Sequence, residues 1–162
     1  MSIEKVRDYF TPFGMADKIM EFDASSATVE LAAKALHCEP ARIAKTLSFK
    51  VNGQCILVVL AGDAKIDNAK YKARFGAKAT MLSPEEALET TGHAVGGVCP
   101  FGIPADVSVY LDVSLKRFAT VFPACGSGHS AIELTIPELE QYATAQDWVD
   151  VGKGWAAESS AR

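Results

Sequence analysis

A glycine- and proline-rich segment, residues 96–102 with the sequence GGVCPFG, could hold a small chemical group through its main chain. It contains a G-x-x-x-P pattern from Gly96 to Pro100, and Pro104 follows shortly after. Glycine lets the backbone approach a ligand closely, and proline stiffens a loop without offering an N–H. The pattern is typical of a pocket wall, although an ordinary surface turn can have the same composition.

The cysteine and histidine residues are dispersed, with cysteines at positions 38, 55, 99 and 125 and histidines at positions 37, 93 and 129. No C-x-x-C pair is present, so we expect reduced thiols, and we expect neither a metal ion nor a cofactor. A different enzyme class, a cysteine hydrolase, would combine Cys99 or Cys125 with His93 or His129. That chemistry needs a base beside the thiol, which the spacing does not show.

Charge is distributed unevenly along the chain. The net charge is −4, yet residues 65–78 (KIDNAKYKARFGAK) contain five basic residues and one acidic residue, so this segment carries +4 and the remainder −8. A basic segment in an acidic protein can bind phosphate groups, and a solvated helix face also explains such a run.

The composition predicts one globular domain. At 162 residues the chain can bury a single sizeable core, and we expect the domain to span residues 1–152, with a flexible tail at 153–162. The N-terminal residues lack the apolar stretch of a signal peptide, and the longest apolar run, residues 55–61, is too short to cross a membrane. We therefore expect a cytoplasmic protein without a membrane partner.

The elements that must position these residues alternate between helix and strand. Asn52-Gly53 separates two apolar runs and predicts a β-hairpin, whose second strand should be central because it is apolar throughout. Ser25 or Ser26 could cap the second helix. We predict helices at 3–13, 27–37, 67–75, 83–91 and from 135, a helical turn at Pro40, and strands near 19–22, 46–51, 54–61, 78–82, 107–111, 120–122, 130–134 and 148–151. A hairpin within such a series predicts a mixed sheet with helices packed around it.

Five segments occur in an order that resembles the YbaK/EbsC family, the free-standing relatives of the prolyl-tRNA synthetase editing domain. They are IAKTLSF (43–49), CILVVLAGD (55–63), TGHAVGGVCPFGIP (91–104), YLDVSL (110–115) and GSGHSAIEL (126–134), so that the resemblance covers roughly residues 3–151. It implies a mixed α/β fold, with a barrel-like β-sheet wrapped by helices. It also implies a trans-acting deacylase that hydrolyses the ester of a wrongly aminoacylated tRNA, without a metal.

The resemblance also implies roles for individual residues. Lys45 matches the functional lysine of the family, and Gly96, Gly97 and Pro100 belong to its G-x-x-x-P loop. Gly126 and Ser127 match a glycine-serine element, next to which His129 lies at a place where relatives differ. The pocket around these groups is expected to include Thr46, Phe49, Val98, Cys99, Phe101, Gly126, Ser127 and His129, and the acceptor end of tRNA to contact Lys65, Lys70, Lys72 and Arg74.

Several alternatives remain open at this point. Family members act on esters of alanine, cysteine, serine or threonine, and the Lys45-Thr46 pair resembles the YbaK-type branch more than the alanine-specific one. The domain could also bind aminoacyl-tRNA or an adenine nucleotide without cleaving it. A partner synthetase is compatible with the resemblance, and the sequence does not indicate an oligomeric state.

Overall fold

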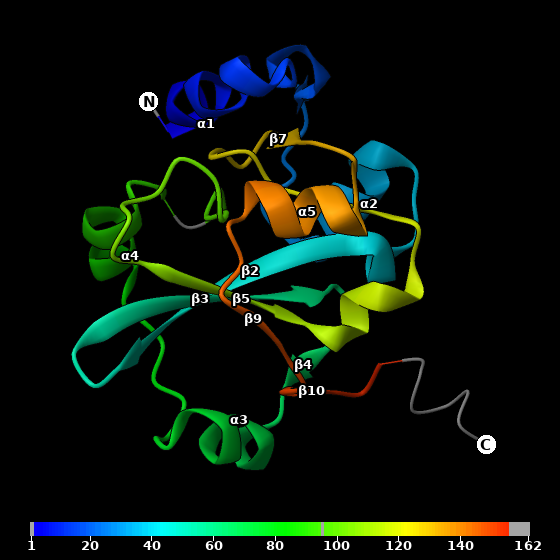
Figure 1. Cartoon of the computed structure of the whole chain (residues 1–162). Coiled ribbons are helices and arrows are strands. Elements are labelled where there is room, and N and C mark those ends of the chain that lie inside the picture. The colour runs from blue at the N-terminus through cyan, green and yellow to red at the C-terminus, as the bar shows by residue number, and fades with distance from the viewer. Residues whose placement is uncertain (1, 95, 156–162) are drawn as a thin grey trace.

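The computed structural model describes residues 2–94 and 96–155, which form a mixed α/β fold around a curled, six-stranded half-barrel (Figure 1). The helices are α1 (Ser2–Phe10), α2 (Val29–Leu36), α3 (Asn68–Phe75), α4 (Pro84–Thr91) and α5 (Ile136–Tyr142), with 3₁₀ turns η1 (Thr11–Phe13), η2 (Ala16–Lys18), η3 (Pro40–Arg42) and η4 (Val113–Arg117). The strands are β1 (Met20–Glu21), β2 (Ile43–Val51), β3 (Gln54–Ala61), β4 (Lys65–Ile66), β5 (Ser108–Asp112), β6 (Thr120–Pro123), β7 (Ser130–Ala131), β8 (Leu134–Thr135), β9 (Asp147–Val149) and β10 (Gly152–Lys153). The expected mixed sheet surrounded by helices is confirmed.

The β2–β3 hairpin is the centre of the sheet. Asn52 and Gly53 have φ angles of 50° and 81°, as a tight hairpin turn requires, and the two strands pair from Ala44–Ala61 to Val51–Gln54. The strand order is β8-β6-β2-β3-β5-β9, in which β5 joins β3 in parallel and β6 joins the first two residues of β2 in parallel. The strand predicted to be central, β3, is therefore paired along both edges.

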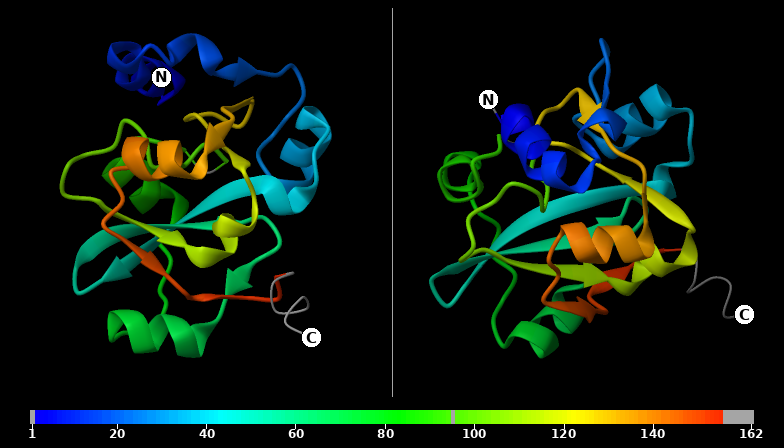
Figure 2. Two further views of the ribbon diagram at one scale, coloured as in Figure 1. Left: turned by 45° about the vertical axis from the view of Figure 1, so that its right-hand side comes forward. Right: turned by 45° about the horizontal axis from the view of Figure 1, so that its top comes forward.

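Two apolar cores lie on the two faces of this sheet. Figure 1 shows α1, α2 and α5 above the sheet and α3 below it, and the turned views of Figure 2 keep α3 on its own side. The larger core contains Phe10, Leu57 and Leu111, whereas the smaller core places Tyr71 of α3 against Phe49 and Val58. Alternate residues of β2 and β3 thus enter different cores, as the pleat of a strand dictates.

Local capping signals fix the ends of the helices. Ser83 and Glu86 form a capping box at the start of α4, and Thr135 and Glu138 form another at the start of α5. Asp67 caps α3, whose C-terminal neighbour Gly76 is left-handed with φ 73°. Within residues 2–94 and 96–155, no helix combines the length and apolar character needed to cross a membrane.

Three local predictions differ from the structure. Residues 78–82 make only an isolated bridge between Met81 and Phe49 instead of a strand, and residues 130–134 form two short strands that pair with different partners. The cap of α2 is Thr28, whose hydroxyl accepts from the Leu31 N–H, rather than Ser25 or Ser26.

The expected tail from residue 153 overlaps with the folded unit. Lys153 of β10 pairs with Lys65 of β4, and the Trp155 ring packs over the guanidinium of Arg117. Residues 156–162 lie outside the described residues.

Asp112 is fully buried at the end of β5 and links it to the C-terminal segment. Its carboxylate accepts from Ser114 N at 3.0 Å and from Val151 N at 2.8 Å. We expect Asp112→Ala to lower the free energy of unfolding by about 3 kcal/mol, because two buried N–H groups lose their acceptor. Urea unfolding measures this change. The control Asp150→Ala removes an exposed carboxylate paired with Lys70 and should cost under about 1 kcal/mol; equal losses would contradict the linking role.

Candidate active site

A cavity of about 450 Å³ lies beside the first half of β2. Its walls come from the start of α2, the start of α4, the glycine-rich loop and the chain around β6 and β7. Most of the side chains are small or apolar. The lining residues are Ser26, Ala27, Thr28, Val29, Ala32, Ile43, Ala44, Lys45, Thr46, Leu47, Ser48, Met81, Leu82, Pro84, Ala87, Gly96, Val98, Phe122, Ala124, Ser130 and Ala131.

The cavity occupies a gap along one edge of β2. Strand β6 pairs with β2 at Ile43 and Ala44, and the chain around Met81 forms an isolated bridge to β2 centred on Phe49. Leu82 N donates to Ser48 O, and Lys50 N donates to Thr80 O, so the backbone groups of Ser48 and Lys50 point away from β3. By the two-residue alternation of a strand, the N–H and C=O of Thr46 point into the gap.

Lys45 is the single ionisable residue of the cavity lining, counted over the part of the chain that the structure describes. Its Nζ donates to Gly62 O at 3.5 Å. Burial lowers the pKa of Lys45, while the nearby carboxylate of Asp63 opposes that shift. The cavity therefore contains one half-buried cation, which can stabilise a negative charge on a bound ligand.

Hydroxyl groups in the cavity lining are further polar groups that a ligand could contact. Most of these residues were not predicted from the sequence to belong to the site. The Thr46 hydroxyl is buried and has no hydrogen-bond partner among the residues described. Ser26 Oγ donates to Ser130 O at 3.5 Å, and Ser130 Oγ accepts from Cys125 N at 3.2 Å. No sequence motif indicated Ser26 or Ser130 as cavity residues, because the pairing of β1 with β7 and the position of α2 bring them there.

Only some residues of the G-x-x-x-P loop line the cavity. Gly96, with φ 95°, and Val98 line it, whereas Gly97 is buried behind it. A Cβ at Gly97 would lie 2.5 Å from Ser127 N and 2.6 Å from Gly126 C, so this position allows two loops to touch. Glycine is thus required at Gly97 for close approach, and at Gly96 for its left-handed backbone.

The remaining residues of the loop belong to the core. Cys99 and Phe101 are fully buried, and Phe101 packs against Phe10 with ring centroids 4.8 Å apart. Pro100 is also buried and does not line the cavity. Phe49, expected as a pocket wall, does not line the cavity: its ring packs against Tyr71 of α3 in the smaller core, with ring centroids 5.0 Å apart.

The segment containing Gly126, Ser127 and His129 supports the cavity from behind. Ser127 Oγ donates to Ser130 Oγ at 3.0 Å and accepts from His129 N at 3.2 Å. The His129 ring is exposed and its Nδ1 lies 3.1 Å from Ala24 O. None of the three lines the cavity, so their contact with a substrate stays a prediction.

The structure does bring one thiol and one imidazole together, but inside the core. Cys99 Sγ lies 3.6 Å from His93 Nε2, which donates to Phe101 O at 2.7 Å. Burial raises the pKa of Cys99 to about 12 and lowers the pKa of His93, and burial likewise raises the pKa of Cys125. A protonated thiol without solvent access cannot act as a nucleophile, so this geometry disfavours the cysteine-hydrolase hypothesis.

The basic segment lies away from the cavity lining. Helix α3 is below the sheet, whereas α2, whose start lines the cavity, is above it (Figure 1). Lys70 pairs with Asp150 at 3.2 Å and Arg74 with Asp147 at 3.1 Å, while the side chains of Lys65 and Lys72 are exposed. Contact of these cations with tRNA stays a prediction. No grouping of three or more potential metal ligands occurs among the residues that the structure describes.

The fold and the cavity define a class of protein. Residues 23–142 match the family model of the aminoacyl-tRNA editing domain, and the chain belongs to this family. The match includes every lining residue of the cavity.

Some similar proteins match this chain over nearly their whole length, whereas others are longer ligases that it matches only in part. YwhH of Bacillus subtilis (strain 168), an uncharacterized protein, is 58% identical over 156 residues, which cover 96% of this chain and 99% of that protein. The proline–tRNA ligase of Lysinibacillus sphaericus (strain C3-41) is 26% identical over 89% of this chain, which spans only 28% of the ligase. A solved structure described as a candidate trans-editing enzyme for prolyl-tRNA synthetase is 30% identical, with a TM-score of 0.85 and coverage of 94% of this chain and 98% of that one.

Gly97 offers a direct test of the contact between the two loops. We expect Gly97→Ala to lower the free energy of unfolding by about 1–3 kcal/mol, because the new methyl meets backbone atoms that must move. Gly128→Ala is the matched control, since its methyl would lie 3.2 Å from the Ala27 side chain and 3.8 Å from the Ala27 Cα, without the close backbone contacts met at Gly97. Urea denaturation compares them; a loss for Gly128→Ala as large as that for Gly97→Ala would contradict the close approach at Gly97.

The lowered pKa of Lys45 has a consequence for stability. A charged lysine whose folded pKa lies below its unfolded pKa opposes folding at neutral pH; the penalty shrinks as pH rises above the folded pKa and is gone above the unfolded pKa. We therefore expect Lys45→Met to raise Tm at pH 7 and the gain to shrink at alkaline pH. Thermal unfolding from pH 7 to 10 measures it. The exposed Lys18→Met should change little; a lower Tm for Lys45→Met would contradict the prediction.

Proposed function

We propose that this protein is a trans-acting aminoacyl-tRNA deacylase, which hydrolyses the ester between a small amino acid and the terminal adenosine of a mischarged tRNA. The observation that carries the proposal is the shared cavity of Lys45 and the Gly96 loop, at the unpaired edge of β2, in a member of the editing-domain family. The solved trans-editing candidate covers nearly the whole chain, which supports a free-standing editing domain.

The proposed reaction is an addition of water to the ester carbonyl. The water oxygen forms a bond with the carbonyl carbon, the bond from that carbon to the ribose oxygen breaks, and a water proton passes to the leaving ribose oxygen. Negative charge develops on the carbonyl oxygen in between. The Lys45 ammonium and the backbone N–H of Thr46 are the groups suited to stabilise it, because both are already positioned at the cavity before the substrate binds.

The described part of the cavity lining provides no general base. No imidazole or carboxylate occurs in its lining, as far as the described residues extend. The proton of the attacking water must therefore move through solvent or through a group that the substrate brings. Such a site works by positioning an activated ester and by stabilising the developing charge. Together these effects can lower the activation free energy by several kcal/mol.

The size of the walls favours a small aminoacyl group. Ala27, Ala32, Ala44, Ala87 and Ala124 line the cavity, and the rigid backbone of β2 forms its floor. Alanine, cysteine, serine and threonine are the substrates we consider. The buried Thr46 hydroxyl, which has no partner among the described residues, favours those with a polar side chain.

The partner is the acceptor end of an aminoacyl-tRNA. The start of α2, capped by Thr28, lies at the cavity and can attract a phosphate through its free N–H groups. We include Lys65, Lys70, Lys72 and Arg74 as contacts farther along the tRNA, and a synthetase as a possible source of tRNA selectivity.

A deacylation panel tests the proposed function. The wild type and Lys45→Ala are incubated with tRNAPro carrying alanine, cysteine or proline, and with tRNAs carrying serine or threonine. We expect rapid loss of one or two esters in the wild type and a rate about 10²–10³-fold lower in Lys45→Ala, which is typical for the removal of one oxyanion-stabilising group.

The matched control is Lys18→Ala, which removes one exposed positive charge outside the cavity and should react like the wild type. Equal losses in both variants would show that net charge, rather than Lys45, matters. If every ester decays at the buffer rate while tRNA still binds, the protein is a binding module and the deacylase proposal fails.

A further inference from the structure

The Gly62 carbonyl that accepts from Lys45 is held by the chain immediately after β3. Gly62 N donates to Ala41 O at 3.3 Å, and a Cβ at Gly62 would lie 2.0 Å from Pro40 O, so the peptide is wedged against η3. The position of the Lys45 ammonium therefore depends on a peptide that cannot move independently of its surroundings.

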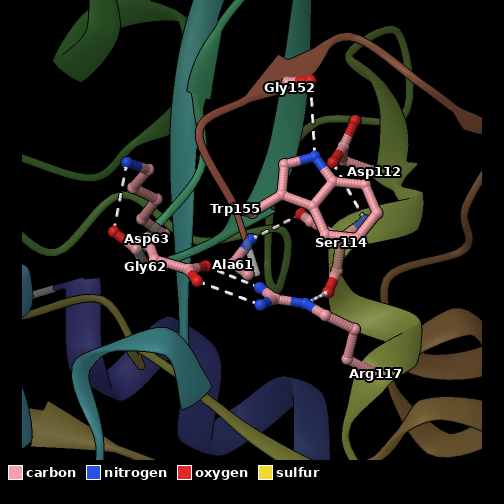
Figure 3. Close-up of polar contacts among 9 residues, drawn as sticks. Ala61, Gly62, Asp63, Asp112, Ser114, Arg117, Gly152 and Trp155 are labelled. Carbon is pink, nitrogen blue, oxygen red and sulfur yellow. Dashed lines mark hydrogen bonds and ion pairs between the residues drawn. The ribbon is translucent and has the colours of Figure 1, made fainter. Parts of the chain in front are cut away.

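The next residue, Asp63, forms a two-pronged ion pair with Arg117 (Figure 3). The two N···O distances are 2.9 and 2.5 Å, and the side chains are only 29% and 15% exposed. Arg117 Nε also donates to Ser114 O at 2.9 Å. A planar guanidinium fixed on both sides holds a carboxylate in one orientation.

Further contacts fix Arg117 and its surroundings. The guanidinium lies under the Trp155 ring, 5.0 Å from its centroid, and Trp155 Nε1 donates to Gly152 O at 3.4 Å (Figure 3). Ala61 N donates to Ser114 Oγ at 3.1 Å. The end of β3, η4 and the C-terminal segment thus form one rigid support beneath Gly62 and Asp63.

We propose that Asp63, oriented by Arg117, is a positioning residue for Lys45: it holds the Gly62 carbonyl in place, and its negative charge attracts the Lys45 ammonium. Neither Asp63 nor Arg117 lines the cavity, so neither is a catalytic residue. The inference rests on the proposed function, since it concerns the residue that would stabilise the oxyanion.

The charges around Lys45 agree with this assignment. Burial lowers the pKa of Lys45, and Asp63 is the largest cause that raises it again. The other charged groups that act on Lys45 are Lys65 of β4, which lowers its pKa, and Glu30 of α2, which raises it. Arg117 pairs with Asp63 and partly neutralises its charge, so the loss of Arg117 should strengthen the effect of Asp63 on Lys45.

Substitutions of the two members should therefore move the titration of Lys45 in opposite directions. Asp63→Asn removes the carboxylate and should shift the Lys45 titration to lower pH. Arg117→Met keeps the packing under Trp155, leaves Asp63 less neutralised, and should shift the titration to higher pH. NMR of ¹³C-labelled lysine measures both, with the Lys45 signal identified by its loss in Lys45→Met.

Deacylation provides the second measurement. Both variants should react about 10- to 100-fold more slowly than the wild type at pH 7, because Lys45 is no longer held in place. In a plot of the deacylation rate against pH, the alkaline limb should move to lower pH only in Asp63→Asn. Asp147→Asn is the control: it removes a carboxylate paired with Arg74 at 3.1 Å, outside the charges that act on Lys45, and should leave titration and rate unchanged.

Each failure can be recognised separately. If the Lys45 titration stays unchanged in both variants while thermal stability falls, the ion pair only joins η4 to the chain after β3 and the positioning proposal is overturned. If Asp63→Asn does not fold, the direction of the shift in Arg117→Met alone decides it. If the wild type hydrolyses no ester, the proposed function fails, whereas the two titrations still test the coupling between Asp63 and Lys45.

Discussion

The unpaired stretch of β2 is the constraint on which the rest of the structure depends. Both faces of the central hairpin are covered, one by the core that includes Phe10 and the other by α3, so a ligand can reach β2 only along an edge. One edge is occupied by β3 throughout, and the other is paired at Ala44 and at Phe49 but open between them. Backbone groups that lack a neighbouring strand are available to a substrate, and the surrounding helices have to shelter them from water.

Local signals predicted much of the fold, because their physical cause lies within a few residues. The Asn52-Gly53 turn and the two capping boxes, at Ser83 and Thr135, specify backbone angles directly, and each occurs as expected. The segments that were assigned incorrectly depend on distant partners. Residues 78–82 have an apolar pattern, but tertiary packing allows only one bridge there, and residues 130–134 are divided because β1 pairs with one part and β6 with the other.

The candidate site was predictable to a smaller extent. The resemblance to a known family located Lys45 and Gly96, since both belong to contiguous motifs, and the cavity contains both. It could not separate residues that line the cavity from residues that support it, such as Gly97 and Cys99, because that distinction depends on how two loops approach each other. Phe49 shows the same limit: it lies on the same side of β2 as Lys45, yet its ring packs against Tyr71 of α3, a contact that no local pattern predicts.

A cavity built in this way can discriminate between ligands by size only if its walls resist movement. Its floor is a strand locked into a six-stranded sheet, and alanine side chains, which have no rotamers to adjust, form much of its wall. One additional methylene changes binding in an apolar pocket by only about 1–3 kcal/mol, so a synthetase that accepts a smaller amino acid needs a second, narrower site to remove it. A rigid cavity whose described lining contains one cation and no base suits the proposed hydrolysis, because an aminoacyl ester is already activated. Strong catalytic groups would add the risk of hydrolysing correct esters, whereas positioning restricts the reaction to the aminoacyl groups that fit.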